Sequence, residues 1–243
     1  MRRGQLGAGR CWGTCDVLCT RGQLRVVLRR DIRQTSSMLI RHRGVVPTID
    51  PTAYVAPTAV VMGAVVVGAH ARVMAGAVVD AEGSTVHVGE RVIVAEHAVL
   101  RATGVGDQDY PVRVGDHAFV GPHATLLGCT IESAVYVATG ATVVHGAVVG
   151  SGAVVAVSAL VHAGTLLPRE FFLAPSTIAV GDPVAVYTAG DPRLPQAIKD
   201  VGFVARAFGV EPAGEDRAST YRRVAQVRAD EFAAHLEDEI LDG

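Results

Sequence analysis

The sequence predicts an all-β solenoid, a left-handed parallel β-helix of hexapeptide repeats with C-terminal α-helices. Three observations lead to this fold class. From Val55 onward, an aliphatic residue and a small residue recur with a period of six. Hydrophobic residues make up 49% of the 243 residues but aromatic residues only 5%, so Val and Ala must fill the core. After the repeats, two segments show the spacing of amphipathic helices.

The N-terminal segment 1–37 has no periodicity and is expected to be disordered or non-native, with Met38 as the natural start. Residues 1–44 carry ten Arg but only Asp16 and Asp31 as acids. An Arg-rich segment of this kind is also compatible with an organelle transit peptide. Cys11, Cys15 and Cys19 have no fourth metal ligand nearby, and their spacing is not the usual Cys-x2-Cys.

The remaining composition excludes several classes of function. Residues 45–243 hold 12 basic and 22 acidic side chains, so no nucleic-acid partner is expected. No apolar run is long enough to span a membrane. Cys129 is the one cysteine outside the N-terminal segment, which provides no disulfide framework and indicates a reducing, cytoplasmic location.

The repeats occupy residues 45–168. Representative units read VGAHAR (67–72), VAEHAV (94–99) and VGSGAV (149–154). The first residue of each unit is expected to point into a triangular coil, and the fifth must be small because the corner is crowded. Coils should stack at the strand spacing of about 4.8 Å, so each buries its aliphatic residues against its neighbours. Insertions near 81–86 and 102–112 are expected to be loops at corners.

Residues 169–243 are expected to form an exit loop and C-terminal helices. Helical spacing covers 195–210 and 216–241, and the second segment has an apolar stripe. The stripe consists of Tyr221, Ala225, Ala229, Phe232, Leu236 and Ile240. Both helices are expected to pack along the solenoid.

Four segments carry a narrower resemblance: PTIDPTAYVAPT (47–58), the loop after Val79, LLGCTI (126–131, in which the unit 126–130 is one residue short of the repeat) and VGDPVAV (180–186). Over residues 45–190 the chain resembles the gamma class of carbonic anhydrases. The resemblance implies a trimer with zinc held between subunits by three histidines, and a zinc-bound hydroxide that attacks CO2.

The zinc ligands of that class are missing in this sequence. Their positions fall on Arg101, Pro122 and Leu127, and none of these side chains is a zinc ligand. The family's neighbouring Arg and Asp become Asp80 and Glu82, and its Asn and Gln become Ile93 and Ala95. We therefore expect a homotrimer without a cofactor, in a structural, assembly or binding role with an unidentified protein partner. The alternative is an enzyme, either a carbonic anhydrase with relocated metal ligands or an acyl-CoA-dependent acyltransferase.

Unit counting places Asp80, Arg101 and Leu127 in one column of successive coils, so Asp80 and Arg101 are expected to form an ion pair. Glu96 of a neighbouring subunit is a second candidate partner for Arg101. The former zinc-site positions Asp80, Glu96, Arg101, Pro122 and Leu127 are thus expected at a subunit interface.

The remaining histidines offer two further candidates. His97 and His123 occupy the same corner of consecutive coils and form a candidate metal pair beside Glu96, with no third ligand specified; the alternative is that His simply suits this outward corner. His87, His145 and His162 are candidates for an acyltransferase base. The alternative is that these three are solvated surface residues.

Overall fold

The computed structural model describes residues 15–20, 23–28, 37–105, 108–211 and 216–241. The chain divides into two compact units, Met1–Thr35 and Ser36–Gly243. In the first unit, β1 (Cys15–Thr20) pairs antiparallel with β2 (Gln23–Leu28). Cys11 lies outside the described residues. The expectation that residues 1–37 are disordered or non-native stays a prediction.

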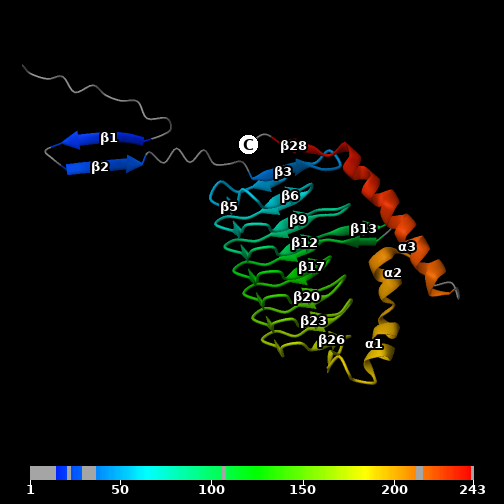
Figure 1. The fold of residues 1–243 in the computed structure, drawn as a ribbon. Coiled ribbons are helices and arrows are strands. Elements are labelled where there is room, and N and C mark those ends of the chain that lie inside the picture. The colour runs from blue at the N-terminus through cyan, green and yellow to red at the C-terminus, as the bar shows by residue number, and fades with distance from the viewer. Residues whose placement is uncertain (1–14, 21–22, 29–36, 106–107, 212–215, 242–243) are drawn as a thin grey trace, which may run out of the picture. The chain divides into compact units, whose positions relative to one another are not determined.

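The second unit is a parallel β-helix with three faces (Figure 1). Face A consists of β4 (Thr48–Ile49), β7 (Val65–Val67), β10 (Val86–Val88), β15 (Val112–Val114), β18 (Thr130–Ile131), β21 (Val148–Val149) and β24 (Leu166–Leu167). Face B consists of β5 (Tyr54–Val55), β8 (Arg72–Val73), β11 (Ile93–Val94), β16 (Phe119–Val120), β19 (Tyr136–Val137), β22 (Val154–Val155) and β25 (Phe172–Leu173).

Face C is the largest sheet, with ten strands. Its parallel strands are β3 (Met38–Arg41), β6 (Val60–Met62), β9 (Val78–Asp80), β12 (Val99–Arg101), β17 (Thr125–Leu127), β20 (Thr142–Val143), β23 (Leu160–Val161) and β26 (Ile178–Val180). An antiparallel strand closes each end: β28 (Glu239–Leu241) pairs with β3, and β27 (Ala185–Tyr187) pairs with β26. The short strands β27 and β28 are therefore the edges of this sheet, and β26 and β3 are paired on both sides.

The core follows the six-residue repeat. On face C the first residues of successive units pair in strict register and are fully buried: Val61, Val79, Leu100, Leu126, Val143 and Val161. The small residues before the strands, such as Ala77 and Ala98, are buried as well. The predicted fold class, a left-handed parallel β-helix with C-terminal helices, is confirmed.

The β-helix is longer than residues 45–168. It begins with β3 and continues through β25 and β26, where Leu173 and Ala179 occupy buried inward positions. The expectation that the repeat ends near Pro168 was wrong. The prolines of this coil interrupt the residue pattern of the repeat, although the backbone continues the β-helix. Pro175 lies in a turn, where its missing N–H removes no ladder hydrogen bond. The second insertion forms an antiparallel hairpin of β13 (Thr103–Val105) and β14 (Gln108–Tyr110).

The C-terminal segment packs along one side of the β-helix and returns to the end where the solenoid begins (Figure 1). It contains α1 (Leu194–Val201), α2 (Phe203–Phe208), α3 (Arg217–Phe232) and the 3-10 helix η1 (Ala233–Glu237). The helix expected over 195–210 is divided at Gly202, whose φ of 65° is left-handed. None of the helices among the described residues combines the length and the apolar character needed to cross a membrane.

The helix expected over 216–241 was too long. It ends at Phe232, and Ile240 belongs to β28, where its side chain is 69% exposed. The buried residues of α3 are Thr220 and Val224 rather than the predicted apolar stripe. The final residues form a strand because β3 presents unpaired backbone groups at the end of face C, and pairing satisfies them.

Candidate functional site

The first candidate site is the column of face C that contains Asp80, Arg101 and Leu127. Arg101 pairs with Asp80 on one side and with Leu127 on the other. Arg101 Nε lies 3.3 Å from Asp80 Oδ2, so the ion pair expected from unit counting is present. Arg101 Nη2 also lies 3.9 Å from Glu82 Oε2. On its other side, the guanidinium carbon lies 4.6 Å from the centre of the Phe232 ring.

Asp80 depends on this pairing. Its side chain is buried, and Oδ1 makes no hydrogen bond. Burial raises the pKa of the Asp80 carboxyl above its ordinary value, and the nearby Arg101 guanidinium opposes that rise. Glu96 and Pro122 lie beyond β11 and β16 at corners of face B. The interface role of all five positions, and a contact with Glu96 of a neighbouring subunit, stay predictions.

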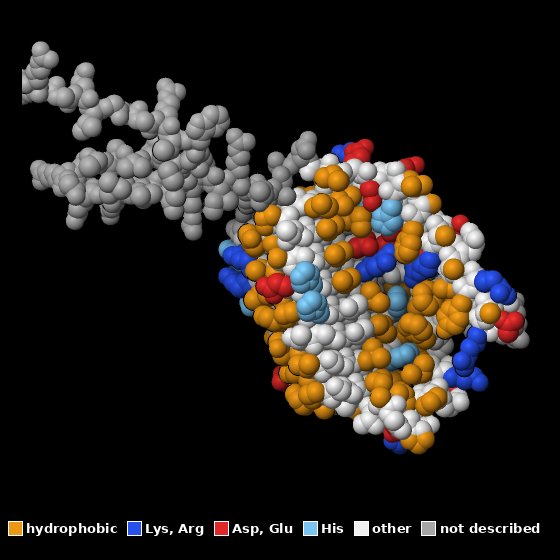
Figure 2. All heavy atoms as spheres, viewed as in Figure 1, with side chains coloured by type: hydrophobic (Ala, Val, Ile, Leu, Met, Phe, Trp, Pro, Cys, Tyr) orange, Lys and Arg blue, Asp and Glu red, His pale blue; other side chains and the backbone are white. Residues whose placement is uncertain are grey.

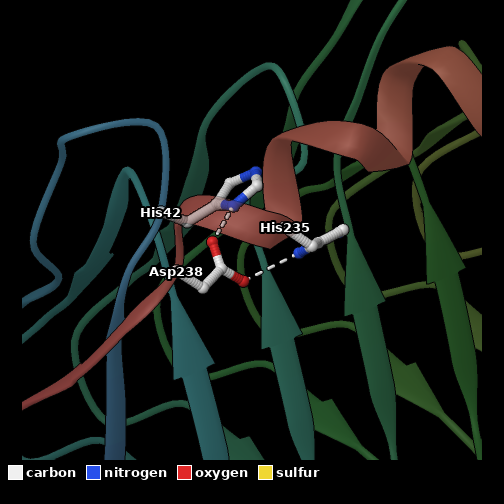
Figure 3. Close-up of side chains that lie close together, drawn as sticks. All are labelled: His42, His235 and Asp238. Atoms are coloured by element: carbon white, nitrogen blue, oxygen red, sulfur yellow. Dashed lines mark hydrogen bonds and ion pairs between the residues drawn. The ribbon is translucent and has the colours of Figure 1, made fainter.

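A second cluster lies beside this column, where η1 meets the first coil (Figure 3). His42 directly follows β3, His235 lies in η1, and Asp238 ends that helix. Asp238 bridges the two imidazoles: Oδ1 lies 2.6 Å from His42 Nδ1, and Oδ2 lies 2.8 Å from His235 Nδ1. The rings stack with centroids 4.5 Å apart and planes inclined by 26°.

Glu82 faces the opposite edge of both rings. Its Oε2 lies 2.7 Å from His235 Nε2 and 3.6 Å from His42 Nε2, and its side chain is 2% exposed. Arg43 Nη2 lies 2.8 Å from Glu82 Oε1. Burial alone would lower the pKa of His235, but Asp238 and Glu82 raise it above its ordinary value. Hydrogen bonds from both histidines hold the pKa of Asp238 below its ordinary value, against the effect of its burial.

His97 and His123 lie at exposed corners of consecutive coils. Their rings stack with centroids 5.2 Å apart and planes inclined by 12°. Gly76 leaves room for this stack, because a Cβ there would come within 2.3 Å of His97 Nδ1. Among the described residues, only His42, His235 and Asp238 form a group of three whose ligand atoms all lie within 4.8 Å of one another. His97 and His123 therefore have no third ligand within that part of the chain.

No protein-family model matches the chain. It is 32% identical to "Gamma carbonic anhydrase 1, mitochondrial" of Arabidopsis thaliana over 114 residues, which cover 44% of this chain and 42% of that protein. It is 34% identical to "Gamma carbonic anhydrase 3, mitochondrial" of the same plant over 112 residues, 43% of each chain. The chain is thus similar to gamma carbonic anhydrases over less than half of its length.

The gamma-carbonic-anhydrase-like match spans less than half the length of each of these curated relatives. Among solved structures, a hexapeptide transferase family protein of Anaplasma phagocytophilum is 22% identical, with a TM-score of 0.46. That likeness covers 82% of this chain and 99% of the other. A shared fold by itself assigns no activity.

The side chains at the three positions that the resemblance assigns to zinc ligands do not fit zinc. Arg101 offers N–H donors and no lone pair, and its guanidinium is held by Asp80. Leu127 stacks beside it in the same column and has no ligand atom. Pro122 likewise has no side-chain donor atom.

His145 and His162 are buried on face C, so the alternative that they are solvated was wrong. The Phe203 ring of α2 covers both, with ring centroids 6.3 Å and 5.4 Å away, and Tyr110 of β14 contacts His145. Nδ1 of each is buried without a hydrogen bond. Burial lowers the pKa of His145 to about 4 and also lowers the pKa of His162. His87 is exposed on face A, so the three histidines do not form one site.

The cluster of His42, His235 and Asp238 was missed at the level of sequence. His42 and Asp238 lie 196 positions apart, and no spacing rule links them. The one signal was local: a histidine flanked by Arg41 and Arg43 directly before the first repeat.

Proposed function

We propose that this chain is a non-catalytic, gamma-carbonic-anhydrase-like subunit that forms a homotrimer and acts in assembly or binding. The observation that supports this is the Arg101–Asp80 ion pair in the column from which the family projects zinc ligands. A cation already occupies that column, and Phe232 of α3 lies over it. A site filled in this way has neither the ligands nor the open coordination position that zinc hydroxide chemistry needs.

Face B supports the trimer. Its outward residues form a row that includes Tyr54, Phe119, Tyr136 and Phe172, and the Phe172 side chain is 63% exposed. Figure 2 shows hydrophobic side chains gathered in columns along the solenoid. Arg72, Ile93 and Val154 stand between these aromatic residues in the same row. Exposed aromatic side chains gathered on one face are typical of protein–protein interfaces. An unidentified protein partner is compatible with the same surface.

The proposed location is cytoplasmic, because one cysteine outside the N-terminal segment provides no disulfide framework. The two curated relatives are named as mitochondrial. Fractionation of cells that express the tagged chain tests this part. A mitochondrial signal would contradict it.

Three measurements on the full chain test the proposed function. Light scattering should give three times the 25.3 kDa protomer mass, and a stable monomer at micromolar concentration would contradict the trimer. CO2 hydration should not exceed the buffer rate, with and without added Zn²⁺. Acetyl-CoA should not bind at millimolar concentration. Hydration above background or saturable acetyl-CoA binding would instead support the enzyme alternative.

A further inference from the structure

We propose that His42, His235 and Asp238 form a binding site for a divalent first-row transition-metal ion, with Zn²⁺ as the representative. The site lies within one protomer, where the C-terminal segment closes on the first coil. None of the three residues occupies a position that the resemblance assigns to zinc. The inference therefore goes beyond the proposed function and does not depend on it.

The donor set is the first argument. Two imidazole nitrogens and one carboxylate are a common three-ligand set for Zn²⁺, and they leave the fourth position to water. The Nδ1 atoms of His42 and His235 both face Asp238, at 2.6 and 2.8 Å. Ligand atoms around a tetrahedral Zn²⁺ lie about 3.3 Å apart, and one ligand atom from each of the three residues lies within 4.8 Å of the other two, so each distance needs to change by about 1.5 Å or less.

The opposite edge of the rings is the second argument. Ligating histidines almost always donate their other ring N–H to a carboxylate or carbonyl. Here Glu82 Oε2 lies within 2.7 Å of His235 Nε2 and 3.6 Å of His42 Nε2. That oxygen is buried and makes no hydrogen bond of good geometry. It is thus an acceptor close to both rings, which a small movement would align with a ring N–H.

The surrounding charges are compatible with a cation at the Nδ1 edge. Arg43 and Arg101 both contact Glu82, so the guanidinium groups gather at the Nε2 edge. Two carboxylates, Asp238 and Glu82, bracket the rings. The bound ion would take the place of the proton on Nδ1, and each ring would then carry its proton on Nε2, facing Glu82. Arg43 Nε now donates to His42 Nε2, and this half-exposed side chain must turn to leave that nitrogen its own proton.

A bound ion would link the C-terminal segment to the first coil of the β-helix. His42 follows β3, and Asp238 precedes β28, which pairs with β3. An ion bound to residues on both sides of this pairing would fix the C-terminal strand to the first coil. Ligands that bind only the folded state raise its stability.

The experiment uses the full chain after exhaustive chelation and dialysis. Titration calorimetry with Zn²⁺ alone should give one ion per protomer, and differential scanning calorimetry should show a higher Tm with Zn²⁺ than with chelator. Co²⁺ substitution should give visible absorption bands without a thiolate charge-transfer band.

Variants locate the ion. His235→Gln and Asp238→Asn should each weaken Zn²⁺ binding at least tenfold, whereas the matched exposed changes His97→Gln and His123→Gln should leave it unchanged. A chain with Cys11→Ser, Cys15→Ser and Cys19→Ser together should bind as the wild type does. Circular dichroism in chelator shows whether each variant folds. If His235→Gln does not fold, Asp238→Asn provides a second test of Zn²⁺ binding at this site.

The proposal is overturned by any of four results. These are no stoichiometric Zn²⁺ binding at micromolar concentration, unchanged binding in folded His235→Gln or Asp238→Asn, loss of binding in the His97 or His123 variants, and loss of binding in the triple cysteine variant. The last two would assign the ion to the exposed histidine stack or to the N-terminal cysteines.

Discussion

Arg101 is held between Asp80 and Phe232, with its Nε 3.3 Å from the carboxylate and its guanidinium carbon 4.6 Å from the ring centre. Asp80 belongs to the preceding coil, and Phe232 is the last residue of α3. One side chain therefore joins two coils of the β-helix and anchors the returning helix. Its charge also compensates two acids, Asp80 and Glu82, that have little access to water.

Arg101→Ala should lower the free energy of unfolding by about 1–3 kcal/mol, because it leaves the buried Asp80 carboxylate without its ion-pair partner. Urea unfolding of the purified chain at pH 7.5 measures this. The matched control is Arg91→Ala, which removes an exposed arginine from its pair with Glu90 and should cost less than about 0.5 kcal/mol. Equal effects of the two changes would show that Arg101 is not a structural ion-pair partner.

Leu126→Ala should destabilise the β-helix by about 2–5 kcal/mol, because Leu126 is fully buried between Leu100 and Val143. The cavity cannot be filled easily in a core of stacked, rigid coils. The comparison is Val66→Ala on face A, where the side chain is largely exposed and the cost should stay near zero. The midpoints and slopes of urea unfolding curves give the loss of unfolding free energy for each of the two variants.

Acidification should destabilise the fold through His145. Its pKa is about 4 in the folded chain, since burial lowers it and the charges of Arg228 and Arg101 act in the same direction. In the unfolded chain the imidazole titrates near 6.5. Between these values the unfolded state binds more protons, so stability is lost as pH falls from about 6.5 to about 4. The loss from His145 is about 3 kcal/mol in total, and His162 acts in the same direction.

The measurement is the free energy of unfolding at pH 7.5 and pH 5. His145→Phe, which keeps an aromatic ring beside Phe203, should make the difference smaller. A substitution at the exposed His117 should leave the difference in unfolding free energy between the two pH values as it is in the wild type. If His145→Phe keeps the full dependence on pH, the acid sensitivity arises elsewhere.

Gly76→Ala should destabilise the chain by about 1–3 kcal/mol. Its φ is +71°, and a Cβ there would overlap His97 Nδ1 at 2.3 Å. In a His97→Ala background the overlap is gone and only the backbone strain of about 1 kcal/mol remains. Thermal unfolding of the two single variants and the double variant should therefore be non-additive. Additive effects would mean that the ring of His97 does not pack over Gly76.

The β-helix was predictable because its register is arithmetic. Each six-residue unit adds one strand, and the insertions lie at corners, so counting units placed Asp80 beside Arg101 and His97 beside His123. Side chains in the second and third places of a unit point outward, and from the repeat alone His145 and His162 appear solvated. Phe203 of α2 covers them, and no local pattern states where a helix will pack.

The cluster around His42 was not predictable for a related reason. It exists because residues 239–241 form a strand on β3 rather than extend a helix. The local spacing of Phe232, Leu236 and Ile240 favours a helix, but the unpaired edge of face C favours a strand, and the tertiary interaction prevails.

The pairing of β28 with β3 also sets an order of events during synthesis. Leu39 pairs with Leu241, so the first coil of the β-helix receives this hydrogen-bonded neighbour only when residues 239–241 have left the ribosome. Until then the nascent β-helix has an unprotected strand at its starting end, the kind of surface that associates with other chains. Premature termination before residue 239 would leave that edge permanently open. Truncated products of this chain should therefore be more prone to aggregate than internal loop variants of equal stability.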